Sequence, residues 1–232
     1  MSSHYTVTDR PTSADREYTS PQRALGLACA GSGIAAVPIA VVTLVLTFSH
    51  RPAVSSNSWS YPFDASAQWA VSGVLAVTHL LTLAGFLGVL VARPHGRSRA
   101  AAAGLWAAVV GYAGLAVCEL LSGSIGASSN DSPEADAVSN AFGVASLVTA
   151  AGSIVAGVVI VRRWGLRDLG WSMVLWSGVA MVVLVTPANI SGNPVARMIA
   201  LSVWSLTFVP LGRALIRGRT EPAAREPAYS HP

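Results

Sequence analysis

Long apolar stretches, each separated from the next by a polar connector, dominate the pattern of this chain. Each stretch has most of the roughly 20 apolar residues that an α-helix needs to cross a bilayer at ~1.5 Å rise per residue. The pattern therefore predicts an all-α integral membrane protein whose six transmembrane helices form a compact bundle. The expected spans are about residues 24–48, 68–91, 100–121, 137–161, 169–185 and 195–216.

Both ends of the chain are polar and rich in Pro, with charges of both signs. Residues 1–23 and 217–232 lack the apolar side chains needed for packing, so we expect two disordered tails. The first apolar stretch begins too late and runs too long for a secretory signal peptide. Residues 24–216 are therefore expected to form one transmembrane domain.

The composition agrees with a membrane environment. Of the 232 residues, 52% are hydrophobic and 11% are charged, whereas soluble domains carry roughly 25% charged residues. All fifteen basic residues are Arg, and a complete absence of Lys is typical of a GC-rich genome. We therefore expect a bacterial plasma membrane, with the lipid bilayer as partner. The net charge of +4 lies in the tails and in short connectors, so it indicates membrane orientation and no nucleic-acid binding.

The arginines are distributed unequally between the two sides of the membrane. If the N-terminus lies in the cytoplasm, the tails and the connectors on that side hold thirteen arginines, and only Arg51 and Arg197 lie on the other side. Cytoplasmic connectors carry the excess of basic residues in membrane proteins. Both termini are therefore predicted to be cytoplasmic.

The second span has an ionisable side chain, His79, near its middle. Gln68, Ser72 and Thr82 share one helical face with it at three–four spacing. An ionisable group at this depth is costly and usually faces the bundle interior or a watery cavity. His79 is either a ligand-binding or proton-relay group, or a neutral imidazole hydrogen-bonded to a neighbouring helix, and we favour the second interpretation.

The third and sixth spans supply further candidates for a polar cavity. Glu119 is the only acidic residue inside a span, Tyr112 precedes it by one heptad, and Arg197 opens the sixth span at a similar depth. We expect Glu119 and Arg197 to pair, either as a structural lock or as the mouth of a polar cavity. The helical rise places His79 roughly 10 Å deeper than Glu119, so direct contact between these two side chains is not expected.

The fourth span carries a polar stripe of Ser139, Ser146 and Ser153 at seven-residue spacing. This stripe should face protein, and Ser146 joins the candidate cavity residues. Small residues four apart, such as Gly104 and Ala108, recur in spans two to four and permit close backbone approach. These three spans are therefore expected near the centre of the bundle.

The connector between the first two spans contains Trp59, Tyr61 and Phe63. Trp and Tyr prefer the headgroup layer of a membrane. We therefore expect a loop that lies on the membrane surface. The alternative is a lid over a cavity between helices.

No sequence motif identifies a reaction. HExxH, GxSxG and the phosphate-binding loop GxxxxGKS are absent, and we expect no cofactor and no metal. Three function classes stay open. The polar positions favour a small permease or channel-like protein, and the small-residue faces favour a non-catalytic scaffold or partner subunit of a membrane complex. The third is a lipid-acting membrane enzyme. The first two could involve a homo-oligomer or a membrane-protein partner.

Overall fold

The computed structural model describes residues 20–49, 54–191 and 193–218, which fold into helices and connecting loops. Six of the helical segments are long and apolar enough to cross a membrane, which confirms the all-α class and the expectation of six span-length helices; we call these six segments the spans. Spans one to four are α1 (Ser20–Ser49), α2 (Ala65–Ala92), α3 (Arg99–Ser124) and α4 (Pro133–Trp164). Span five comprises α5 (Met173–Ala180), the π-helical turn η1 (Met181–Val185) and α6 (Thr186–Ile190), and span six comprises α7 (Pro194–Leu206) and α8 (Phe208–Arg217).

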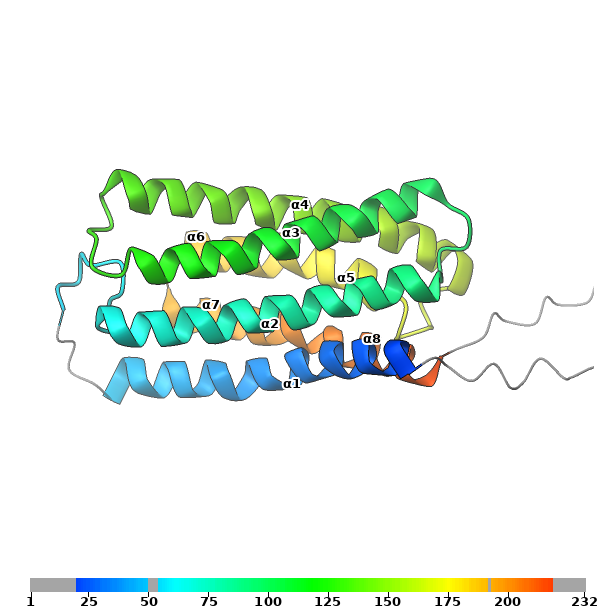
Figure 1. The fold of residues 1–232 in the computed structure, drawn as a ribbon, viewed down its shortest axis with the longest axis horizontal. Helices are drawn as coiled ribbons and strands as arrows, with labels where there is room; N and C mark the ends of the chain where they lie inside the picture. The colour runs from blue at the N-terminus through cyan, green and yellow to red at the C-terminus, as the bar shows by residue number, and fades with distance from the viewer. Residues whose placement is uncertain (1–19, 50–53, 192, 219–232) are drawn as a thin grey trace, which may run out of the picture.

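The helices lie side by side along the long axis of the molecule (Figure 1). One end of the bundle contains the start of α1, the end of α8 and the connectors 93–98 and 165–172. We call it the arginine-rich end, because the described arginines other than Arg197 lie in or beside these segments. The opposite end contains the loops 54–64 and 125–132, and we call it the acidic-loop end.

Side-chain caps explain where several helices begin. The side chains of Asp64, Ser98, Ser132 and Asn193 accept hydrogen bonds from backbone N–H groups in the first turns of α2, α3, α4 and α7. Such caps satisfy donors that have no partner inside the helix. Ser132 is followed by Pro133 at the first helical position, where proline is favoured because the missing N–H would have no partner inside the helix.

The fifth span begins and ends four to five residues later than expected, at Met173–Ile190 instead of 169–185. Pro187 and Pro194 predict a polar turn over residues 186–194, but the helix continues to Ile190. Pro187 has no N–H to donate and its ring crowds the carbonyl four residues earlier. The wide turn η1 directly precedes it and relieves this crowding, and the Thr186 hydroxyl donates to the Met181 carbonyl at 2.9 Å. At the other end of the chain, α1 begins at Ser20, inside the segment predicted as a tail.

Two glycines allow α3 and α4 to approach closely. A Cβ atom on Gly152 would lie 2.5 Å from the carbonyl oxygen of Gly104 and 2.6 Å from the backbone nitrogen of Ala108. Since real Cβ atoms do not come this close to backbone, only glycine fits. The third span is the most buried of the six, but the sixth is buried as much as the fourth, which the sequence did not indicate.

His95 in the connector 93–98 is expected to make stability depend on pH. It is 7% exposed, and burial, followed by the charges of Arg93 and Arg163, lowers the pKa of its imidazole. The unfolded chain therefore binds the proton more tightly, so stability is complete above the unfolded pKa of about 6.5 and is lost as the pH falls through it. When the pH is lowered from 8 to 5, the temperature of the thermal unfolding midpoint in detergent should decrease. The decrease should be smaller in His95→Gln. Equal slopes for both proteins would contradict this assignment.

Candidate functional site

A cavity of about 960 Å³ lies within the acidic-loop half of the bundle. All six spans and the loop 54–64 line it, and the exposed residues Ser56, Asn130 and Asn193 form part of its rim. Its volume is near the upper end of the range found for small-molecule pockets, roughly 300–1,000 Å³. The space is thus large enough for one small organic molecule.

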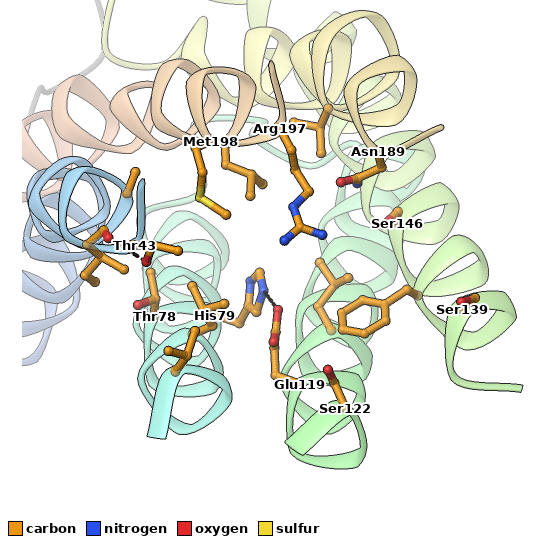
Figure 2. A pocket seen from close by; sticks show the side chains of 18 of the residues that line it. Thr43, Thr78, His79, Glu119, Ser122, Ser139, Ser146, Asn189, Arg197 and Met198 are labelled. Carbon is orange, nitrogen blue, oxygen red and sulfur yellow. Dashed lines mark hydrogen bonds and ion pairs between the residues drawn. The ribbon is translucent and has the colours of Figure 1, made fainter. Parts of the chain in front are cut away.

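The side chains of His79 and Glu119 meet inside this cavity (Figure 2). Nε2 of His79 lies 3.6 Å from Oε1 of Glu119, and each side chain is 13% exposed. His79 is near the midpoint of the 28-residue helix α2, roughly 20 Å from either helix end. The expectation that these two residues do not touch is therefore wrong.

The relative height of α2 and α3 explains this contact. Gly123, near the end of α3, lies against Trp69 and Ser72, so α2 extends beyond α3 by one to two turns. Glu119 is therefore deeper in the bundle than its distance from the end of its own span indicates. Side chains also lean toward the N-terminus of their helix. Because α2 and α3 are antiparallel, His79 and Glu119 lean toward each other.

Arg197 points into the same cavity from the first turn of α7 (Figure 2). The predicted ion pair between Glu119 and Arg197 is not formed, because Glu119 contacts His79 instead. Within the described ranges, no carboxylate lies at ion-pair distance from the Arg197 guanidinium. Among the described residues, the ionisable side chains of the cavity lining are His79, Glu119, Arg197 and Tyr61.

The structure divides the other predicted residues into two groups. Gln68, Thr82 and Ser146 line the cavity, whereas Ser72 and Tyr112 do not. Ser72 is buried between helices and accepts a hydrogen bond from Nε2 of Gln68 at 3.3 Å. Tyr112 is fully buried, and its hydroxyl makes no hydrogen bond with the protein. The polar face of α2 is thus shared between the cavity and the contact with α3.

An aromatic cluster closes the cavity on the side of the arginine-rich end. Trp204 lines the cavity and stacks on Tyr112, with ring centroids 6.1 Å apart and an interplanar angle of 20°. Phe208 contacts both rings edge-on, and Phe86 lies 5.0 Å from the Tyr112 centroid. Nε1 of Trp204 donates to the Ser177 carbonyl at 3.0 Å. We call these four aromatic residues the floor.

The loop 54–64 forms part of the cavity wall. Trp59, Tyr61 and Phe63 line the cavity, and Nε1 of Trp59 donates to the Ser122 hydroxyl at 2.9 Å. The backbone N–H of Trp59 also donates to the Ser128 carbonyl at 2.9 Å. This arrangement differs from the favoured expectation of a loop on the membrane surface and agrees with the alternative of a lid.

Sequence reasoning missed several lining residues. Asn189 lines the cavity from α6, and Trp204 closes it from α7. Asn189 was assigned to a turn, and only its place in an apolar helix could have marked it as a candidate. Trp204 carries no local signal, because aromatic residues are common in membrane helices. In the part of the chain that the structure describes, no group of three or more His, Cys, Asp and Glu side chains is arranged to hold a metal ion.

Comparison of the chain with protein-family models, with curated proteins and with solved structures gives no match. A functional interpretation therefore depends on the geometry and charge of the cavity. The relevant features are the paired His79 and Glu119, the unpaired Arg197 and the floor.

Proposed function

We propose that this chain is a small multi-pass permease of a bacterial plasma membrane. It binds a solute in the cavity from outside the cell and releases the solute on the cytoplasmic side. The observation that carries this proposal is the cavity, which reaches from one end of the bundle to an ionisable pair at half the length of α2. Intramembrane ionisable groups that face a cavity typically mark substrate or proton pathways.

The orientation follows from the arginines. Connectors at the arginine-rich end carry Arg93, Arg97 and Arg167, and Arg162 and Arg163 lie in the last turn of α4. An excess of basic residues favours the cytoplasmic side. Both termini are then cytoplasmic, and the cavity faces outward. The protein thus adopts an outward-facing state with the floor closed.

Buried polar atoms in the floor and on its arginine-rich side support a second, inward-facing state. The Tyr112 and Ser153 hydroxyls, the Ser172 hydroxyl and Nε1 of Trp171 are buried and make no hydrogen bond with the protein. A buried polar group without a partner costs about 1–3 kcal/mol. A rearrangement that parts the floor and admits water would let these groups form hydrogen bonds.

Two observations disfavour the alternatives. The small-residue faces that suggested a scaffold are occupied within the chain, since Gly26 packs against Gly212 and Gly104 packs against Gly152. A lipid-acting enzyme of the hydrolase type needs a nucleophile held by a base. Among the described residues, no hydroxyl is hydrogen-bonded to His79.

Cysteine labelling tests the proposal. In a chain with Cys29 and Cys118 replaced by Ala, Ser146→Cys places a thiol in the cavity lining and Ser153→Cys places one at a fully buried position on the same helix, two turns nearer the arginine-rich end. A membrane-impermeant maleimide, which reacts with thiolates in water, should label Ser146→Cys from outside. It should label Ser153→Cys from the cytoplasmic side, slowly, as the floor opens.

Val144→Cys is the matched control, because Val144 lies on the same helix, is 63% exposed on the outer surface of the bundle and does not line the cavity. It should stay unlabelled in lipid. No labelling of Ser146→Cys from outside would contradict the outward-facing cavity. Labelling of Ser146→Cys without any labelling of Ser153→Cys from the cytoplasmic side would reduce the protein to a binding protein and contradict transport.

A further inference from the structure

We infer that the cavity recognises a small organic anion with one carboxylate on a compact apolar body, and that anion binding is coupled to the uptake of one proton by the His79–Glu119 pair. Arg197 is the counter-charge of the carboxylate. This inference rests on the proposed permease function and names the substrate class of the same site.

Arg197 is an exposed residue, and among the described residues its charge has no carboxylate partner. Its guanidinium points into the cavity (Figure 2), and no described carboxylate lies at ion-pair distance. Glu119, the only acidic residue among the described residues of the lining, contacts His79. A guanidinium presents a planar fork of donors that matches a carboxylate in bidentate geometry. The site thus contains a ready receptor for an external carboxylate.

The protonation of His79 sets the net charge of the cavity. Of the helices that line it, α1, α4 and α6 contribute only hydroxyl, amide and apolar side chains, and the lining residues of the loop 54–64 include no carboxylate, His or Arg. With neutral His79, the charges of Glu119 and Arg197 sum to zero. With protonated His79 the sum is +1, which one carboxylate neutralises. Binding of the anion and of the proton therefore strengthen each other by linkage.

Apolar side chains make up much of the lining, beside hydroxyl and amide groups such as those of Thr78, Ser146 and Asn189 (Figure 2). Leu75, Leu115, Phe142, Met198 and Leu201 all line the cavity. They give an apolar body a place to bury its surface, at roughly 25 cal/mol per Å².

Benzoate is the probe, because it has one carboxylate on a compact apolar ring. Binding to the full chain in lipid nanodiscs is measured by calorimetry at pH 8 and at pH 6. We expect saturable binding that is tighter at pH 6 and no binding of the cation benzylamine. Arg197→Gln should weaken benzoate binding at least about tenfold. Arg97→Gln removes the same charge from the connector 93–98, at the opposite end of the bundle, and should change nothing.

Two further variants separate proton coupling from simple attraction. In His79→Gln, benzoate binding should lose its dependence on pH. In Glu119→Gln, the cavity charge is already positive at pH 8, so benzoate should bind at pH 8 about as tightly as it binds the parent protein at pH 6. A merely structural ion pair would not produce this gain in affinity.

Several results would overturn the inference. The inference fails if benzoate shows no saturable binding at millimolar concentration, or if the protein prefers benzylamine. It also fails if Arg197→Gln binds benzoate with unchanged affinity. Labelling of Ser146→Cys and Ser153→Cys is measured in the same lipid without benzoate. If labelling from the two sides follows the expected pattern while benzoate does not bind, the anion assignment fails and the permease proposal stands.

Discussion

Trp204→Ala is expected to lower the free energy of unfolding by about 3–5 kcal/mol and to make the bundle leaky. Trp204 is 4% exposed, stacks on Tyr112, packs against Phe208 and is held by a hydrogen bond to the Ser177 carbonyl. Its removal deletes the floor residue that faces the cavity. Stability is measured by unfolding in mixed micelles, and leakage by proton entry into proteoliposomes that contain a pH-sensitive dye.

Trp106→Ala provides the control for this change. Trp106 lies on α3 and is 56% exposed, so its loss removes the same ring without opening a cavity in the core. Its effect should be within about 0.5 kcal/mol, as for most surface substitutions, and the vesicles should stay tight. If Trp204→Ala were as stable and as tight as Trp106→Ala, the aromatic cluster would not be the floor of the cavity.

Gly152→Ala is expected to destabilise the protein by about 1–3 kcal/mol, because one added methyl group overpacks the contact between α3 and α4. The new Cβ atom would lie 2.5 Å from the Gly104 carbonyl oxygen, so the two backbones must separate. Gly143→Ala on the same helix is the matched control, since its Cβ atom would meet nothing within 4 Å. Gly143→Ala should be neutral or slightly stabilising. Equal stability of the two variants would show that the helices are not in close contact here.

The number and approximate position of the spans follow from the sequence, because the length of an apolar stretch and the thickness of a bilayer are matched locally. The start of α4 at Ser132-Pro133 could also be predicted, since capping depends on a few neighbouring residues. That His79 faces the bundle interior can also be predicted from the sequence, because an ionisable group in the middle of an apolar helix must find a polar environment.

The composition of the candidate site depends instead on how the helices are placed against one another. Spacing along one helix gives depth only relative to its own ends, whereas the contact of His79 with Glu119 requires the offset of α2 against α3. The same holds for Arg197, whose charge is left unpaired by that contact. Trp59 and Trp204 enter the cavity wall through a loop and a helix distant in sequence. Such contacts depend on helix height, tilt and rotation, which tertiary packing sets and which no local pattern of residues encodes.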